Sequence, residues 1–251
     1  MGRIWAIGDL HLSFALPDKS MDLFGDDWKN HAEKIALHWK SVVHPEDLVL
    51  IPGDISWAMR LEEALIDLQW IDQLPGTKVM IKGNHDYWWD SLKKLVQVMP
   101  PSIHVIQNNS FSWKEVAIGG TRLWDSSEYD FSSFIEYREN PKQKGMDVEE
   151  KMQEELRGKI FTRELSRLEM SLKELNPKAK TRIAMTHYPP IGADLASSQA
   201  HQLFLKYGVT IVVFGHLHSL KKGVSLFGEK EGIRYICVSA DLIHFQMTAI
   251  L

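Results

Sequence analysis

Short apolar runs, each followed by a segment rich in glycine and polar residues, constrain this chain more than any other feature. They occupy residues 4–7, 48–51, 79–81, 183–185, 211–214 and 235–238. Their length and β-branched content are typical of buried strands. Segments with apolar residues at helical spacing lie between several of these runs, as in 28–43 and 57–71. This alternation predicts an α/β fold with helices on the faces of its sheets.

The length of the chain and one charged stretch define the expected domain organisation. A chain of 251 residues can form one α/β domain with a large core, so we expect a single domain over residues 1–251. Residues 140–180 are strongly charged and lack strand patterning, and we interpret them as a helical insertion within this domain. We expect the insertion to pack on the domain, and the alternative is a cap over a functional site. Its apolar helical face consists of Phe161, Leu165, Leu168, Leu172 and Leu175.

Charge and cysteine content limit the partners and the compartment. The formal net charge is -4 with acidic and basic residues interspersed, which argues against a nucleic-acid partner or an anionic membrane. Cys237 is the only cysteine, so an intrachain disulfide and a cysteine-based zinc site are both excluded. No apolar stretch approaches the roughly 20 residues that span a bilayer. We therefore expect a cytoplasmic protein without membrane attachment, and the sequence leaves its oligomeric state open.

Side chains of the types that can bind metals follow the apolar runs. They lie in the segments GDLH (8–11), GD (53–54), GNHD (83–86), HYPP (187–190) and GHLH (215–218). Because ligands bind at the carboxyl edge of open α/β sheets, we expect these side chains to converge there. Carboxylate oxygens, an amide oxygen and neutral imidazoles, with no thiolate, suit divalent metals of hard to borderline character. The set can hold two ions if one carboxylate bridges them, and paired ions can stabilise both the attacking and the leaving oxygen of an in-line displacement.

In this order and spacing, the segments resemble the motifs of the calcineurin-like metallophosphoesterase superfamily, and the resemblance extends from Gly8 to His218. It implies an α/β fold of four layers, an α/β/β/α sandwich in which helices flank two mixed sheets. It also implies a dinuclear metal site at the edges of the sheets. The metal ligands implied by the motifs are Asp9, His11 and His218 for one ion, Asn84, His187 and His216 for the other, and Asp54 as the bridge between them.

The resemblance also implies the chemistry of the site. Asp54 and His85 would be the catalytic residues of a metal-dependent phosphoesterase, in which a hydroxide that bridges two metal ions attacks the phosphoric ester. His85 would lie near the leaving-group oxygen and stabilise the transition state or donate a proton, a role that suits an imidazole. The expected cofactors are two divalent ions, manganese, iron or zinc, with manganese favoured.

Two positions depart from the pattern of the superfamily. Many members, including the protein serine/threonine phosphatases, follow the bridging aspartate with an acid that orients the catalytic histidine and an arginine that binds phosphate. Trp57 and Ala58 stand at these positions here, which argues against a protein phosphatase. The candidate replacements are Asp86 and Asp125 for the acid, and Arg60 and Arg122 for the arginine.

The missing arginine leads us to a small-molecule phosphodiester or a nucleotide as the expected substrate. Arg122 is the preferred substrate-binding residue because it follows a predicted strand at 116–118, and the alternative is a surface arginine in a loop. An apolar loop at 13–27 suggests a second hypothesis, a pyrophosphohydrolase of nucleotide or lipid diphosphates. A third hypothesis, a scaffold that binds a partner protein, is disfavoured because such relatives usually lose ligands and here every ligand position is filled. The aromatic residues 87–89 are interpreted as core packing, with stacking on a planar substrate group as the alternative.

Overall fold

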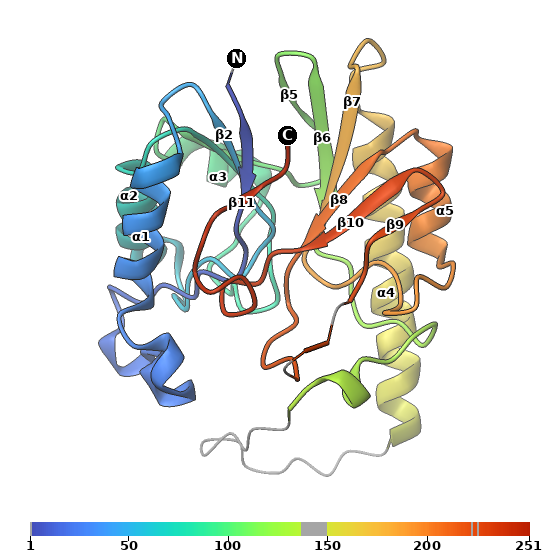
Figure 1. Cartoon of the computed structure of the whole chain (residues 1–251), viewed down its shortest axis with the longest axis horizontal. Helices are drawn as coiled ribbons and strands as arrows, with labels where there is room; N and C mark the ends of the chain where they lie inside the picture. Colours follow the sequence, from blue (N-terminus) through green and yellow to red (C-terminus); the bar gives the residue numbers. More distant parts are fainter. Residues whose placement is uncertain (1, 137–149, 222, 225) are drawn as a thin grey trace.

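Two mixed β-sheets lie face to face at the centre of the computed structural model, which describes residues 2–136, 150–221, 223–224 and 226–251 (Figure 1). The 5-stranded sheet contains β1 (Ile4–Ala6), β2 (Leu48–Ile51), β3 (Thr77–Met80), β4 (Ile103–Val105) and β11 (Thr248–Ala249), in the order β11-β1-β2-β3-β4. The 6-stranded sheet contains β5 (Phe111–Trp113), β6 (Val116–Thr121), β7 (Thr181–Thr186), β8 (Ile211–Phe214), β9 (Glu229–Lys230) and β10 (Ile233–Cys237), in the order β5-β6-β7-β8-β10-β9. Strands β11, β5 and β9 pair antiparallel with their neighbours, and the other neighbouring strands are parallel.

Alternation along the strands separates the layers of the fold. In β1, Ile4 and Ala6 pack between the two sheets, whereas Trp5 packs under the helices that cover the first sheet. In β8, Val213 packs between the sheets and Val212 lies in the outer core of the second sheet. Consecutive side chains of a strand point to opposite faces, so each of these strands is buried in two cores at once. This double burial explains why the strands are continuous apolar runs.

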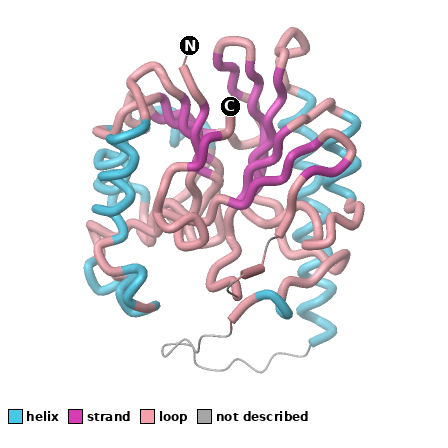
Figure 2. Tube along the Cα trace, in the orientation of Figure 1, coloured by secondary structure: helices cyan, strands magenta, loops and turns pink. Residues whose placement is uncertain are grey.

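Helices cover the outer face of each sheet (Figures 1 and 2). Helices α1 (His31–Val42), α2 (Leu61–Asp72) and α3 (Leu92–Val98) pack on the first sheet, and α4 (Glu150–Lys173) and α5 (Gln199–Lys206) pack on the second. This arrangement confirms the predicted α/β/β/α sandwich. The short 3-10 helices are η1 (Pro17–Lys19), η2 (Met21–Phe24), η3 (Asp26–Trp28) and η4 (Ser132–Phe134). Within the described ranges, no helix has the length and apolar character required to cross a bilayer.

Helix α4 lies within the stretch predicted to be a helical insertion. Its residues Leu168 and Leu172 are buried in the same core as Ala184 of β7. The second half of the helix is therefore an outer layer of the sandwich. Residues 140–149 lie outside the described part of the chain, and the bounds of the insertion and of the single domain stay predictions.

Candidate metal centre

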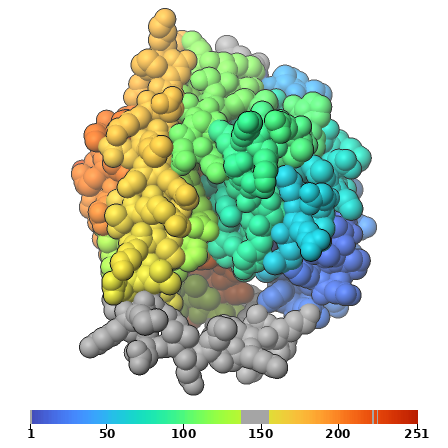
Figure 3. All heavy atoms as spheres, turned by 180° about the vertical axis from the view of Figure 1, so that it is seen from behind, coloured from blue at the N-terminus to red at the C-terminus, as the bar shows by residue number. Residues whose placement is uncertain are grey.

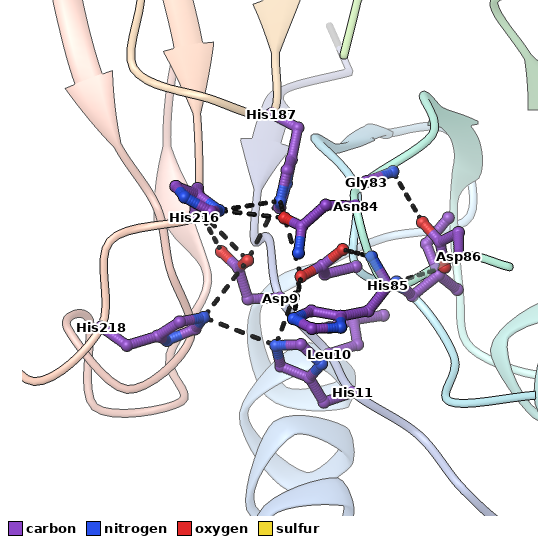
Figure 4. A network of polar contacts seen from close by, with 12 residues as sticks. Asp9, Leu10, His11, Gly83, Asn84, His85, Asp86, His187, His216 and His218 are labelled. Carbon is purple, nitrogen blue, oxygen red and sulfur yellow. Dashed lines mark hydrogen bonds and ion pairs between the residues drawn. The ribbon is translucent and has the colours of Figure 1, made fainter. Parts of the chain in front are cut away.

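The loops that follow β1, β2, β3, β7 and β8 meet at the carboxyl edges of the two sheets, where their polar side chains point toward one another (Figure 4). In these loops, Asp9, His11, Asp54 and His216 have φ angles of 56°, 45°, 51° and 72°. Residues with a Cβ atom rarely adopt this left-handed conformation, which persists where the surrounding structure enforces it and is concentrated at functional sites. The strained backbone at four of the converging residues accords with a functional site.

Two glycines let carboxylates of the cluster lie directly against neighbouring loops. A Cβ atom on Gly83 would overlap the side chain of Asp54, and one on Gly215 would overlap the side chain of Asp9. Both carboxylate oxygens of Asp9 consequently lie 3.1 Å from the backbone N–H of His216, which donates to them. Glycine is required at both positions because of this close approach.

Asp9, His11 and His218 form one half of the cluster. The Nε2 atom of His218 lies 3.5 Å from Oδ1 of Asp9 and 3.4 Å from Nε2 of His11. Asp9 and His11 are buried. The three side chains offer one ligand atom each within 4.8 Å of the others, a spacing that allows one metal ion between them.

His187, Asn84 and His216 form the other half. The Nδ1–H of His187 donates to the carbonyl of Pro52 at 3.0 Å, so its Nε2 atom carries a lone pair in the neutral ring. This Nε2 atom lies 2.7 Å from Oδ1 of Asn84, and Nδ1 of His216 lies 3.0 Å from the same oxygen. A lone pair and an amide oxygen at this distance repel each other unless a cation binds both. The donor set therefore fits a divalent metal.

Asp54 lies between the two halves. Its Oδ2 atom is 3.7 Å from Nε2 of His11 and 3.5 Å from Nε2 of His187. Both distances are long for a hydrogen bond, but they match atoms that each lie about 2.0–2.2 Å from a shared ion. Asp9, Asp54 and His187 also offer ligand atoms within 4.8 Å of one another, so Asp9 belongs to both halves as well.

Burial controls the protonation of the cluster. It lowers the pKa of His11, His187 and His216, so these rings are neutral at neutral pH and present lone pairs. Burial raises the pKa of Asp54 most, the negative charge of Asp9 raises it further, and together they bring it to about 8. A divalent cation would offset the repulsion between the two buried carboxylates, which is a further reason why the cluster fits a metal.

Asp241 contacts the cluster and is absent from the predicted site residues. Its Oδ1 atom accepts the Nδ1–H of His218 at 2.9 Å, and its Oδ2 atom accepts the N–H of Ser219 at 3.0 Å. The carboxylate thereby holds the His218 ring with Nε2 toward Asp9, as in carboxylate–histidine–metal sites. Burial alone would lower the pKa of His218, but Asp9 and Asp241 raise it well above its usual value. A signal was present, because Asp241 follows the apolar run at 235–238 as the other polar groups follow theirs.

We expect Asp241→Asn to weaken metal binding by about 10- to 100-fold, because the amide keeps the size of the side chain but loses the charge that orients and polarises His218. Calorimetric titration of manganese into chelator-treated protein measures the affinity. Asp194→Asn changes an exposed carboxylate and is the matched control, which should bind metal like the wild type. Equal affinities of the two variants would contradict the role of Asp241.

His85 faces the cluster, and among the described residues no acid forms a hydrogen bond with its ring. Its backbone N–H donates to Oδ1 of Asp54 at 2.8 Å, and its Nε2 atom lies 4.0 Å from Oδ2 of the same residue. Its Nδ1 atom is buried and has no hydrogen-bond partner among the described residues. The ring of Trp57 packs against it with centroids 4.4 Å apart, and also stacks on His11 at 5.1 Å. The aromatic ring of Trp57 therefore occupies the position at which many members of the superfamily have the acid that orients the histidine.

Neither candidate replacement for that acid hydrogen-bonds to His85. Asp125 instead lines a cavity beside the cluster. Asp86 is buried and ties two loops together, so it has no free oxygen for the neighbouring ring. The donors to Asp86 are the backbone N–H groups of Ile55, Ser56 and Gly83 and the indole N–H of Trp88. Both candidates are wrong.

The structure does not bring either candidate arginine into the cluster. The guanidinium group of Arg122 lies 3.4 Å from Oε1 of Glu164 and 4.5 Å above the ring of Trp124. Arg60 lies exposed at the start of α2. The backbone of Arg122 does reach the site, because its carbonyl accepts the N–H of His187 at 3.1 Å. A substrate-binding role for the Arg122 side chain stays a prediction.

The aromatic residues 87–89 divide into two environments. Trp88 and Trp89 are buried in the core under the first sheet, as the packing interpretation predicts. Tyr87 is exposed, and its ring centroid lies 6.3 Å from that of His85. The stretch thus supplies two packing residues and one exposed ring near the cluster.

An aromatic cavity adjoins the cluster. Its volume is about 350 Å³, and its lining includes Trp124, Asp125, Tyr129, Tyr188 and His216. The ring of Tyr188 packs on His216 with centroids 4.0 Å apart and on Trp124 at 5.0 Å. The cavity therefore shares a wall with the half of the cluster that contains His216.

Comparison with known proteins establishes the family. The sequence model of the calcineurin-like phosphoesterases matches residues 2–220. The chain belongs to the calcineurin-like phosphoesterase family, as its motifs predict. Members of this family usually bind divalent metals, and the aspartate and histidine groups described above can hold one.

Two curated relatives match one part of the chain. The gene 66 protein of Mycobacterium phage L5 is 37% identical over 86 residues, which are 34% of this chain and 41% of the phage protein. The gene 66 protein of Mycobacterium phage D29 is 36% identical over 86 residues, with the same shares of 34% and 41%. The matched region spans about two fifths of the length of these relatives.

Two solved structures share the fold over nearly the whole chain. AQ665 from Aquifex aeolicus, a protein of unknown function, has a TM-score of 0.50 and 15% sequence identity, and the match covers 99% of this chain and 96% of that one. The phosphopantetheinyl hydrolase PptH from Mycobacterium tuberculosis has a TM-score of 0.51 and 14% identity, with 100% and 96% covered. At these identities the likeness concerns the fold.

Proposed function

We propose that this phosphoesterase hydrolyses a small-molecule phosphodiester or a nucleotide. One observation carries the proposal: neither candidate arginine reaches the cluster, because Arg122 pairs with Glu164 and Arg60 lies exposed at the start of α2. The dianion of a phosphomonoester is usually bound by guanidinium groups that match its oxygens. A diester carries one negative charge less and depends less on such a clamp. Trp57 and Ala58, at the positions of the acid and the arginine, fit this substrate class.

We further propose that the cluster holds two divalent ions, with manganese favoured, and that Asp54 and His85 are catalytic. When bound, the ions supply a bridging hydroxide nucleophile and polarise the phosphoryl oxygens. The proposed ligands are Asp9, His11 and His218 for one ion, Asn84, His187 and His216 for the other, and Asp54 between them.

Residues of the chain prepare this chemistry before any ion binds. The carbonyl of Pro52 and the carboxylate of Asp241 accept the Nδ1–H groups of His187 and His218, and so hold both Nε2 atoms toward the cluster. Burial lowers the pKa of His85 most, neighbouring histidines lower it further, and together they bring it to about 4. His85 is then neutral at pH 7, which supports a role as a hydrogen-bond donor to the transition state over a role as an imidazolium acid.

The aromatic cavity supports a substrate with a planar group. Trp124 and Tyr188 provide its aromatic walls, and side chains of this kind stack on nucleobases. Asp125 adds a hydrogen-bond acceptor, which suits an exocyclic amine. The volume of about 350 Å³ lies in the range of small-molecule sites.

A comparison of two esters with the same leaving group tests the substrate class. With manganese-loaded protein, we expect kcat/KM for bis-p-nitrophenyl phosphate to exceed that for p-nitrophenyl phosphate by about tenfold, the effect of one missing charge-assisted contact to the monoester. Faster hydrolysis of the monoester would contradict the diester preference. A wider screen should include nucleotides and a phosphopantetheinyl ester, because PptH shares the fold.

One observation favours a second candidate, a pyrophosphohydrolase of nucleotide or lipid diphosphates. The loop at 13–27 reaches the site through Met21, whose sulfur accepts the indole N–H of Trp57 at 3.2 Å. Phe14 and Leu23 of this loop are exposed, as expected of a surface that receives an apolar group. Faster hydrolysis of a diphosphate than of bis-p-nitrophenyl phosphate in the same screen would select this candidate.

We infer a cytoplasmic location from the cysteine content. Cys237 is the single cysteine of the chain, so it has no intrachain disulfide partner. Burial raises the pKa of its thiol to about 12. A half-buried thiol with a raised pKa and no intrachain disulfide partner suits a reducing compartment.

A further inference from the structure

A second cavity, rich in cationic side chains, lies between α4 and the loops that follow β3 and β4. Its volume is about 470 Å³, and none of the proposed metal ligands lines it. Figure 3 shows this side of the molecule, with α4 in yellow beside the teal segments around α3 and β4. The charged residues that line the cavity are Lys82, Asp90, Arg122, Arg163, Glu164 and Arg167.

The cavity has an excess of positive charge in a protein whose formal net charge is -4. The cationic side chains outnumber the two carboxylates, and one of these, Asp90, pairs at 2.8 Å with Lys94, which does not line the cavity. Lys82 has no hydrogen bond or ion pair within the ranges of the chain that the structure describes. An anion would therefore compensate charges that the protein leaves unbalanced.

Glu164 holds the arginines in place. It is buried, and its Oε1 atom lies 2.8 Å from Arg167, 3.4 Å from Arg122 and 3.6 Å from Arg163. Its Oε2 atom accepts the hydroxyl of Thr121 at 3.1 Å. One carboxylate compensates one charge, so Glu164 orients the guanidinium groups of Arg122 and Arg167 without neutralising the three arginines. Groups oriented in advance lose less conformational entropy when a ligand binds.

We propose that this cavity binds the phosphate group of a small phosphorylated molecule. Guanidinium groups bind phosphate oxygens in a bidentate manner, and the Lys82 ammonium adds a point charge. The volume lies in the range of small-molecule sites and leaves room for an organic part attached to the phosphate. The cavity is a neighbour of the metal cluster, since Lys82 lies in the same loop as Asn84 and the carbonyl of Arg122 accepts the N–H of His187.

Equilibrium dialysis of the metal-loaded protein with labelled inorganic phosphate tests the proposal. We expect two classes of bound phosphate, one at the metal cluster and one in the cavity. Lys82→Gln and Arg163→Gln should each weaken the cavity class by about tenfold, as expected for the loss of one charge-assisted contact. Lys159→Gln is the matched control and should change neither class, because Lys159 pairs with Glu155 on the exposed part of α4. Thermal melting should show that all three variants remain folded.

Two results would overturn the proposal: a single class of phosphate that Asp54→Asn abolishes, or wild-type binding by both cavity variants. Neither result depends on the protein hydrolysing an ester, so this test is independent of the proposed function. KM values then identify the source of the phosphate. If the substrate supplies it, Lys82→Gln raises KM for an ester with a second phosphate group and leaves KM for a singly phosphorylated ester unchanged. If a separate molecule supplies it, both KM values stay at the wild-type level.

Discussion

Asp54→Asn should lower kcat/KM for model phosphoesters by about 1000-fold or more. The Oδ2 atom of Asp54 lies 3.7 Å from Nε2 of His11 and 3.5 Å from Nε2 of His187, so the substitution removes the negative charge between the two halves of the cluster. Ions held there would lose their shared anionic ligand, and with it several kcal/mol of charge stabilisation in the transition state. Steady-state kinetics and the metal content of the purified variant, measured by mass spectrometry, check this prediction.

Asp67→Asn is the matched control for this variant. Asp67 is also fully buried, and its carboxylate accepts the hydroxyl of Ser56 and the N–H of Phe14, neither of which belongs to a proposed ligand. An asparagine can keep both contacts, because its oxygen accepts one hydrogen bond and its amide donates the other. Its activity should therefore stay near that of the wild type. A fully active Asp54→Asn protein would contradict the proposed two-ion site.

Removal of metal should lower the melting temperature by about 10 °C. A ligand present at 1,000 times its dissociation constant and bound only by the folded state adds about 4 kcal/mol to the free energy of unfolding. Each kcal/mol corresponds to about 2–4 °C for a domain of this size. Scanning calorimetry of manganese-loaded and chelator-treated protein measures the shift, and added manganese should reverse it. Identical melting curves would contradict a buried metal site.

The destabilisation by the chelator should be larger at pH 8.5 than at pH 7. In the metal-free protein, burial and then Asp9 raise the pKa of Asp54 from 3.8 to about 8. Between these values the folded state binds more protons than the unfolded state, so the free energy of unfolding falls as the pH rises through 8. His218, whose pKa is raised by Asp9 and Asp241, acts in the same direction. A bound cation pairs with the ionised carboxylate and removes this loss, so only the metal-free protein should show it.

The layout of the ligands was predictable because it follows from strand order. Asp9, Asp54 and His187 each follow an apolar run, and parallel strands bring such positions to the carboxyl edge of each of the two sheets. Helix boundaries were less predictable. The helical pattern at 28–43 corresponds to a helix that begins only at His31, because the preceding residue adopts a left-handed conformation.

The sequence places Asp241 after an apolar run, but the ligand that it contacts was not predictable, because such partners come from other segments of the fold. Asp241 contacts His218 from 23 residues further along the chain. Arg122 follows a strand just as the ligands do, but its side chain turns to Glu164 on α4. No local pattern in the sequence reveals how that helix lies on the sheet. The contacts of Asp86 were not predictable for the same reason. The N–H groups that donate to its oxygens belong to Ile55 and Ser56 in another loop as well as to Gly83 in its own loop.

The position of Trp57 has an evolutionary consequence. Its ring stacks on His11, its indole N–H donates to the sulfur of Met21, and its carbonyl accepts the ammonium of Lys19 at 3.1 Å. An acid at this position would keep the backbone carbonyl that accepts Lys19 but would lose the indole N–H that donates to Met21 of the loop at 13–27. We therefore expect that replacing Trp57 with an acid, without other changes, would not convert this site into that of the relatives which carry the acid. We expect tryptophan and loop to be inherited together, so that homologues which share one also share the other and form a lineage of their own.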